Sequence, residues 1–225
     1  MKKIIFCIQN YFIEEILTAN NIIDDNSIVI RDKADLSYDF LKIHNPEFIM
    51  FPHWSSKVDS RIVNDFKCIC FHSSPLPYGR GGSPIQNMIT RGHHETEVCS
   101  LLMVEDFDAG PIFLRTKIKL DGRLDEILQR VYQAISEQIL EFMNKDLQSE
   151  VQKGKVTIFK RLLDNRIFLN KSLEEIYNKI RMLDSDLYPN PYIDLDNKRI
   201  EFYNAKLKNN TLKANIVIRN TDADE

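Results

Sequence analysis

Short apolar runs alternate with stretches of helical period over the first third of the chain. The runs with the length and composition of buried strands lie at residues 3–8, 26–30, 48–51 and 67–71. The stretches between them that repeat apolar residues at the helical period lie at residues 12–17, 35–43 and 60–66. Strands that alternate with helices are typical of a parallel sheet covered on both faces. The pattern therefore predicts an α/β fold with a Rossmann-like, mostly parallel sheet and helices on both faces.

The middle of the chain predicts a hairpin followed by a long helix. A helix is expected at residues 84–91, because Pro84 suits a first helical position and Gly92 suits a stop. Residues 96–104 and 111–118 predict two strands joined by an acidic turn at residues 105–110. Apolar residues then recur at helical spacing across residues 124–147, which predicts one amphipathic helix.

The composition becomes polar and basic between residues 148 and 155, and we place a domain boundary near residue 150. Residues 151–225 then predict a small α+β appendage. Its helix, at residues 172–183, begins with Ser172 and Glu175 at capping-box spacing. Two short strands follow at residues 200–205 and 212–218, and we expect residues 220–225 to be frayed. The predicted organisation is thus a domain of residues 1–150 and a C-terminal subdomain of residues 151–225.

Composition and charge narrow the function classes. The 225 residues are 43% hydrophobic, enough for a buried core, and the formal net charge of −3 comes with no basic block suited to a phosphate backbone. A large nucleic-acid partner is therefore disfavoured, whereas a single nucleotide is not. The four cysteines show no paired-ligand spacing and follow no signal peptide, which favours reduced thiols, a cytoplasmic location and no metal site. No apolar run reaches membrane-spanning length.

One turn-rich segment, residues 70–85, concentrates the candidate chemistry. His72 directly follows an apolar run, and the prolines and glycines after it suit a backbone that approaches a ligand closely. In open parallel sheets the ligand crevice lies outside the carboxyl ends of the strands, where His72 is expected. The alternative is a buried histidine bound to a carbonyl. Asp108 lies in the acidic turn, which by itself is more typical of a solvated hairpin tip.

Together these two segments resemble the 10-formyltetrahydrofolate-dependent formyltransferase family. The family's loop pattern, N-x-H-x-S-x-L-P-x-x-R-G-x-x-P, is matched at His72, Ser74, Leu76, Pro77, Arg80, Gly81 and Pro84. Its D-x-G turn is matched at Asp108 and Gly110. The resemblance runs from residue 1 to about residue 150. It implies an enzyme that uses 10-formyltetrahydrofolate as its formyl donor and needs no metal.

The resemblance also implies a mechanism. An acceptor amine attacks the formyl carbon, and the tetrahedral oxyanion needs a donor held in place beforehand. His72 would be that donor and a proton carrier, while Asp108 would orient His72 and hold the water or amine from which the proton leaves.

One position departs from the family pattern. The asparagine expected two residues before the histidine is Cys70, and a thiol is a weaker donor than an amide. We interpret Cys70 as a small buried residue in the space of the asparagine. A covalent formyl-thioester on Cys70 is the alternative, which an apolar strand end disfavours because it suppresses the thiolate.

Ligand-contacting residues follow from the family only in part. The resemblance implies that two segments hold the folate, made up of Trp54, Ser55, Ser56 and Lys57, and of Met103, Glu105, Asp106 and Phe107. Trp54 is equally consistent with a core aromatic. The candidates for contact with the acceptor are His53, Ser74, Arg80, Gly81 and Gln86.

The acceptor is predicted from the rest of the chain. The tRNA enzymes of the family carry a large basic C-terminal domain, whereas only about 75 residues follow the boundary here, which argues against a tRNA. The short tail, the form of the loop at residues 79–84 and Tyr188-Pro189 resemble nucleotide-sugar N-formyltransferases. Among these, the run from Phe71-His72 to Gln86-Asn87 resembles the pseudaminic-acid type. This resemblance implies UDP-4-amino-4,6-dideoxy-N-acetyl-altrosamine, which is our expected small-molecule acceptor.

Two alternatives stay open at this point. The enzyme could formylate another amine such as an aminoacyl group. The chain could also be an inactive module that binds folate or a sugar nucleotide, because Cys70 replaces the asparagine. We expect no nucleic-acid or membrane partner, and the apolar tail suggests a possible homodimer.

Overall fold

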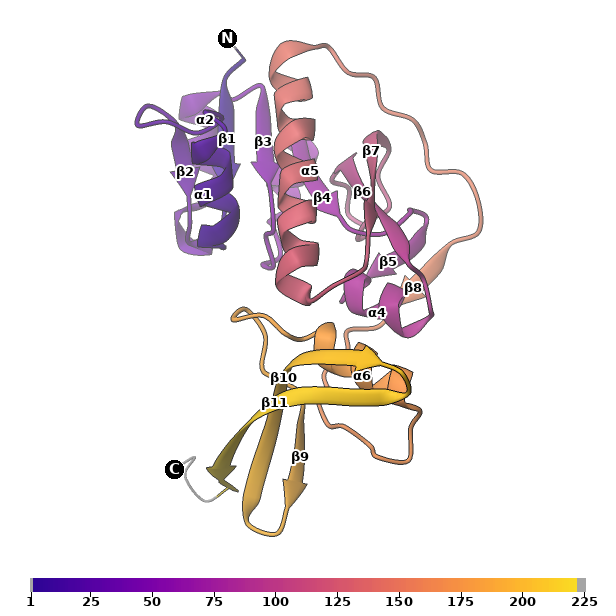
Figure 1. The fold of residues 1–225 in the computed structure, drawn as a ribbon. Coiled ribbons are helices and arrows are strands. Elements are labelled where there is room, and N and C mark those ends of the chain that lie inside the picture. The colour runs from indigo at the N-terminus through magenta and orange to yellow at the C-terminus, as the bar shows by residue number, and fades with distance from the viewer. Residues whose placement is uncertain (1, 222–225) are drawn as a thin grey trace. The chain divides into compact units, whose positions relative to one another are not determined.

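The computed structural model describes residues 2–221, which form two compact units (Figure 1). The first unit comprises the described residues up to Gly81, together with Glu97–Ile118 and Arg130–Ile158. The second comprises Gly82–Thr96, Lys119–Gln129 and the described residues from Phe159 onward. The division that we predicted near residue 150, into a catalytic domain and a subdomain, stays a prediction.

A six-stranded sheet with the strand order β2-β1-β3-β4-β6-β7 organises the first unit. Its strands are β1 (Ile4–Cys7), β2 (Ile28–Ile30), β3 (Phe48–Phe51), β4 (Cys68–His72), β6 (Glu95–Leu102) and β7 (Ile112–Lys119). The first four are mutually parallel, and β6 lies antiparallel to β4, with His72 opposite Cys99. The predicted α/β class, with a hairpin on a mostly parallel sheet, is therefore confirmed.

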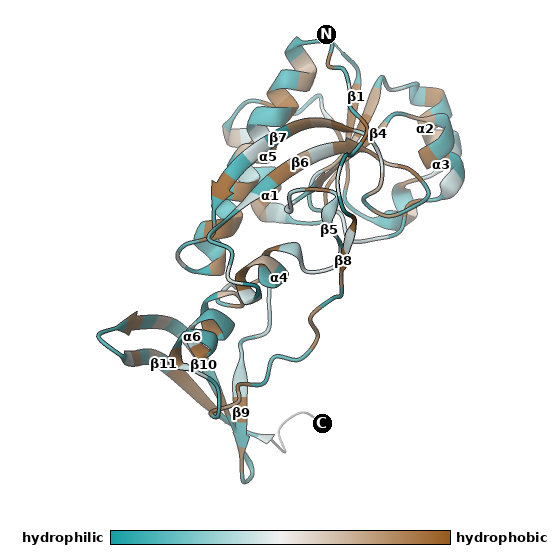
Figure 2. Cartoon of the chain, turned by 90° about the vertical axis from the view of Figure 1, so that its right-hand side faces the viewer, coloured by the Kyte–Doolittle hydropathy of each residue, from teal (hydrophilic) through white to brown (hydrophobic). Residues whose placement is uncertain are grey.

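Helices cover both faces of this sheet, as Figure 2 shows with α1 and α5 on one side and α2 and α3 on the other. The four are α1 (Tyr11–Ala19), α2 (Tyr38–His44), α3 (Ser60–Asp65) and α5 (Leu124–Asn144). Leu41 of α2 and Ile62 of α3 are buried in one cluster with Ile49 and Phe51 of β3. On the other face Phe142 of α5 packs edge-on against Phe48, with ring centroids 5.5 Å apart. These contacts fix the sheet between two apolar layers.

Local capping explains where two of the predicted helices begin. The Ser37 hydroxyl accepts from the Phe40 N–H and caps α2, so this helix begins three residues after the predicted start at Asp35, which lies in the 3₁₀ turn η1 (Lys33–Asp35). Ser172 and Glu175 form the predicted capping box at the start of α6 (Leu173–Arg181). Both boundaries therefore follow from side chains that were visible in the sequence.

The second unit contains α4 (Pro84–Thr90), α6 and a three-stranded antiparallel sheet in the order β11-β10-β9. Its strands are β9 (Tyr192–Leu195), β10 (Lys198–Lys208) and β11 (Thr211–Asn220). Ile176 and Ile180 of α6 pack with Ile167 and Ala205 in its core. The sequence did not predict β9, nor the pair β5 (Tyr78–Gly81) and β8 (Thr157–Phe159), because short, half-exposed or glycine-rich strands carry little alternation. Of the predicted frayed end, residues 222–225 lie outside the described residues.

Two further features bear on function. No helix within residues 2–221 combines the length and apolar character needed to cross a bilayer. The four cysteines are free thiols, as expected, with Cys7, Cys68 and Cys99 buried and Cys70 half-buried.

Candidate active site

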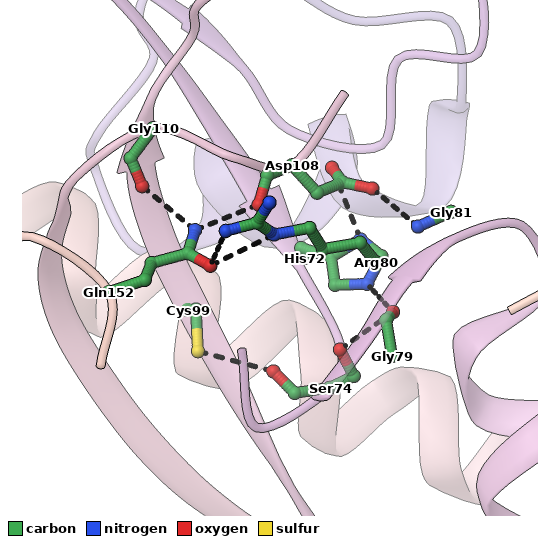
Figure 3. A network of polar contacts seen from close by, with 9 residues as sticks. All are labelled: His72, Ser74, Gly79, Arg80, Gly81, Cys99, Asp108, Gly110 and Gln152. Atoms are coloured by element: carbon green, nitrogen blue, oxygen red, sulfur yellow. Dashed lines mark hydrogen bonds and ion pairs between the residues drawn. The ribbon is translucent and has the colours of Figure 1, made fainter. Parts of the chain in front are cut away.

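His72 is the last residue of β4 and only 7% of its surface is exposed. Its Nε2 lies 2.7 Å from the Gly79 carbonyl oxygen, and because a carbonyl only accepts, Nε2 carries a proton. Its Nδ1 lies 3.4 Å from Oδ1 of Asp108 (Figure 3). The structure therefore brings together the two residues that the sequence singled out, and it directs one ring nitrogen of the histidine towards the carboxylate.

Asp108 is held in the turn that joins β6 to β7. Its φ of +55° lies in the left-handed region, which aspartate tolerates better than most residues. The Gly81 N–H donates to Asp108 Oδ2 at 2.8 Å. At Gly110 a Cβ atom would lie 1.8 Å from the Leu102 carbonyl oxygen, so the glycine of the D-x-G turn is required by space.

Gln152 is a site residue that the sequence reasoning missed. Its Nε2 donates to the carbonyl oxygens of Asp108 and Gly110, both at 2.8 Å. Its Oε1 accepts from Nε and Nη2 of Arg80, at 3.1 and 2.8 Å. A single glutamine in a polar stretch gives no signal of such contacts, and our boundary at residue 150 also separated it from the catalytic domain.

Ser74 supports the loop from inside the protein. Its side chain is fully buried, and its hydroxyl donates to the Gly79 carbonyl at 3.0 Å, the same oxygen that faces His72. The Cys99 thiol donates to the Ser74 carbonyl at 3.3 Å. These bonds fix the acceptor atom for Nε2 of His72. The predicted contact of Ser74, Arg80 and Gly81 with an acceptor stays a prediction.

Cys70 packs against two clusters of buried apolar residues, one that contains Phe51 and Val58 and one that contains Leu76. Burial raises the pKa of the Cys70 thiol well above its usual value, and the negative charge of Asp108 raises it further. The thiol therefore stays protonated at neutral pH. This supports the interpretation of Cys70 as a space-filling residue over the formyl-thioester.

The two segments predicted to hold a folate each pack against the apolar cluster that Cys70 also contacts. Trp54 and Met103 are partly buried against the same cluster as Cys70. Gln9 shapes the first segment, because its Oε1 accepts from the Ser55 N–H and hydroxyl and its Nε2 donates to the Ser56 hydroxyl. The remaining side chains of the two segments are exposed, namely those of Lys57, Glu105, Asp106 and Phe107.

Two observations test whether a folate fits these segments. The indole Nε1 of Trp54 is buried and has no hydrogen-bond partner among the described residues, so a ligand acceptor would satisfy it. Phe107 is 71% exposed, which is unusual for a phenyl ring and leaves a flat apolar surface for an aromatic ring. The residues therefore fit a bicyclic aromatic ligand with polar edges. No group of three metal-ligating side chains was found among residues 2–221.

His53 and Gln86 each bond to other parts of the protein. His53 Nδ1 lies 2.6 Å from the Tyr132 hydroxyl, which also accepts from the Asn10 amide, and burial lowers the pKa of His53. Gln86 belongs to the second unit, where its buried amide donates to the Met182 carbonyl at 3.3 Å. Their contact with an acceptor stays a prediction.

Two family models match this chain. One, described as formyl transferase, matches residues 35–147, which is half of the chain. The other, described as the C-terminal domain of methionyl-tRNA formyltransferase, matches residues 163–219.

Individual proteins show the same likeness. A methionyl-tRNA formyltransferase from Thermotoga neapolitana is 28% identical over 178 residues, which cover 74% of this chain and 56% of that relative. The chain thus spans little more than half the length of this curated relative. A solved methionyl-tRNA formyltransferase from Clostridium thermocellum is 34% identical with a TM-score of 0.90, over 98% of this chain and 100% of that chain.

More distant structures share the fold. HypX from Aquifex aeolicus, solved in complex with tetrahydrofolic acid, gives a TM-score of 0.77 at 18% identity and covers 91% of this chain and 38% of that chain. A 4-N formyltransferase from Francisella tularensis gives 0.65 at 17% identity, over 85% of this chain and 91% of that chain. At such identities the likeness is one of fold alone.

Proposed function

The chain belongs to the formyl transferase family, and from that premise we propose that it transfers a formyl group from 10-formyltetrahydrofolate to a primary amine. The observation that carries the proposal is the 3.4 Å approach of His72 Nδ1 to Asp108 Oδ1 beside the ends of β4 and β6. An imidazole and a carboxylate at this distance are the groups that acyl transfer to an amine requires.

The two side chains have separate tasks in this proposal. The attacking amine must lose a proton, and the Asp108 carboxylate is the base that accepts this proton. The tetrahedral oxyanion needs positive charge nearby, and His72 supplies it when both ring nitrogens are protonated, since Nε2 faces a carbonyl and Nδ1 faces a carboxylate. The side chains of His72 and Asp108 are 8% and 19% exposed, so these charges act with little screening by water.

Trp54, Met103 and Phe107 are the residues that we propose to hold the folate. When bound, 10-formyltetrahydrofolate supplies the formyl carbon as an acyl electrophile and a leaving nitrogen that accepts a proton. The indole N–H of Trp54 would donate to a polar edge of the ring system, while the exposed ring of Phe107 would cover an apolar face. Gln9 would keep the Ser55–Ser56 backbone in place.

For the acceptor we propose an aminoacyl group, the alternative that we left open beside the expected nucleotide sugar. We propose further that a tRNA carries this group, which departs from our expectation of no nucleic-acid partner. The relatives described above at 28% and 34% identity are methionyl-tRNA formyltransferases, and the model of the C-terminal domain of such enzymes matches residues 163–219. The net charge of −3 also conceals an asymmetry. Residues 198–220, which contain β10 and β11, carry six Lys or Arg and one Glu, and five of these six cations are exposed. A basic sheet of this kind favours a phosphate backbone.

A nucleotide-linked amino sugar remains the second candidate. It is supported by the fold shared with the Francisella tularensis 4-N formyltransferase, which matches less well than the methionyl-tRNA enzymes do. The UDP-4-amino-4,6-dideoxy-N-acetyl-altrosamine that we expected as the acceptor belongs to this candidate.

One experiment separates the candidates. The chain is incubated with 10-formyltetrahydrofolate and, in parallel, with methionyl-tRNA, free methionine and a panel of UDP- and dTDP-linked amino sugars, and the product masses are read. We expect methionyl-tRNA alone to gain one formyl group. Formylation of an amino sugar alone would overturn the aminoacyl acceptor, and no product from any amine would overturn the transferase itself.

A further inference from the structure

The side-chain amide of Gln152 uses its full hydrogen-bonding capacity inside the site. The two N–H groups of Nε2 go to the carbonyls of Asp108 and Gly110, and Oε1 accepts two N–H groups from Arg80. An amide offers two donors and two acceptor lone pairs, so all four are matched here. A glutamine that merely covered the surface would exchange such bonds with water.

These four bonds reach Asp108 from two sides. One side is the backbone of its own turn, which holds Asp108 at a φ of +55°, a conformation that needs support from its surroundings. The other side is β5, because Arg80 precedes Gly81, whose N–H donates to Asp108 Oδ2. Gln152 is therefore the side chain that ties the aspartate turn to the strand binding its carboxylate (Figure 3).

The segment that carries Gln152 is itself fixed to the sheet. Two residues earlier, Glu150 and Ile112 form an isolated antiparallel bridge, in which each N–H donates to the other's carbonyl at 2.8 Å. Ile112 is the first residue of β7, directly after the aspartate turn. The linker therefore presents Gln152 to the turn from a defined register.

We propose that Gln152 is a positioning residue for the formyl transfer, which acts by fixing the Asp108 carboxylate beside Nδ1 of His72. The inference rests on the proposed function for its catalytic consequence. Its structural consequence, a fixed bond between Gly81 N–H and Asp108 Oδ2, stands independently of any activity.

The test is Gln152→Glu, which keeps the bonds of the side chain to Arg80 and removes its bonds to the Asp108 and Gly110 carbonyls. The new carboxylate keeps its acceptors for Arg80 but has no N–H for the Asp108 and Gly110 carbonyls, and it repels both oxygens. We expect kcat to fall about 100-fold while KM for the amine changes little, because misplacement of a catalytic group by about 1 Å costs that much. The matched control is Gln148→Glu, an exposed position in the same linker that gains the same charge.

A double-mutant cycle distinguishes positioning from general support. If Gln152 acts through Asp108, then Gln152→Glu slows an Asp108→Asn enzyme by less than about threefold, since residues that act as a unit are not additive. A full 100-fold further loss in that background would overturn the proposal, as would a folded Gln152→Glu enzyme with wild-type kcat. Should Gln152→Glu fail to fold, Gln152→Met replaces it, with the same expectations.

Amide hydrogen exchange gives a readout that needs no substrate. We expect exchange of the Gly81 amide to become faster in Gln152→Glu and to stay unchanged in Gln148→Glu. Unchanged Gly81 protection in Gln152→Glu would overturn the positioning role even if activity were lost. If the wild-type chain formylates no amine, the proposed function fails, while the exchange measurement still decides whether Gln152 fixes the carboxylate.

Discussion

Asp108→Asn removes one negative charge from the candidate site and changes almost nothing else. Asparagine has the same shape, tolerates the left-handed conformation at φ +55° and still offers an oxygen to the Gly81 N–H. We therefore expect the variant to fold with a melting temperature within a few degrees of the wild type. Its effect should fall on the chemistry alone.

The size of that effect follows from the distance between the two groups. Unit charges 3.4 Å apart attract by about 5 kcal/mol at an effective dielectric constant of about 20. The loss of even half of this from the transition state is about 2.5 kcal/mol, or close to 100-fold in rate. Because the variant also loses the base for the amine proton, which by itself contributes 10²–10⁴-fold, we expect kcat/KM to fall by about 10⁴-fold or more.

The assay measures formyl-amine formation under steady-state conditions, with Asp25→Asn as the matched control. Asp25 is exposed in the turn before β2 and belongs to neither predicted folate segment, so its variant changes the net charge equally without altering the site. An Asp108→Asn enzyme within threefold of the wild type would refute the reasoning. Equal losses in the two variants would refute it as well, because the effect would then belong to the net charge of the protein.

Three further predictions address the parts around this pair. Gly110→Ala should lower the free energy of unfolding in urea by about 3 kcal/mol, because its Cβ atom would clash with the Leu102 carbonyl oxygen. Gly92→Ala is the control, because a Cβ atom there meets open space and only the φ of +78° is unfavourable, so we expect a loss of about 1 kcal/mol. Equal losses in the two variants would contradict this. Cys70→Ala should keep kcat within about tenfold of the wild type. The Cys70 thiol of the folded wild type should resist alkylation by iodoacetamide at pH 7, because its pKa is raised, and rapid alkylation at Cys70 would contradict this. Burial lowers the pKa of His53 in the folded state, so below about pH 6.5 the unfolded chain binds more protons and the free energy of unfolding falls as the pH drops. In urea unfolding at several pH values, His53→Gln should reduce this dependence of the free energy of unfolding on pH. An unchanged dependence would show that His53 does not cause it.

The strands that carry the site were visible in the sequence because burial on both faces leaves an unbroken apolar run. Phe48–Phe51 is predicted with its observed bounds, and the run ending at Phe71 locates β4 to within one residue. The pairing of His72 with Asp108 did not follow from either segment alone, since an acidic turn is usually a solvated tip. It followed from the joint motif, in which Gly110 marks a turn with no room for a side chain.

The contacts that fix the site were less visible, for a physical reason. β5 is glycine-rich and pairs with three residues of β8, so neither shows alternation. Gln152 bonds to residues more than 40 positions earlier in the sequence, and such long-range side-chain bonds produce no periodic pattern of apolar residues. The charge of β10 and β11 was hidden in a different way, because acidic residues elsewhere outweigh it in the total.

The bonds that position His72 and Asp108 show whether the replacement of the family asparagine by Cys70 disturbs the site. His72 is held by the Gly79 carbonyl, and Asp108 by the Gly81 N–H and by Gln152. Among the described residues, none of these bonds involves Cys70, so the replacement leaves the approach of His72 to Asp108 intact. What it removes is an amide donor, because a protonated thiol donates only weakly. On the proposed mechanism the charge of His72 must then supply a larger share of oxyanion stabilisation than in relatives that keep the asparagine.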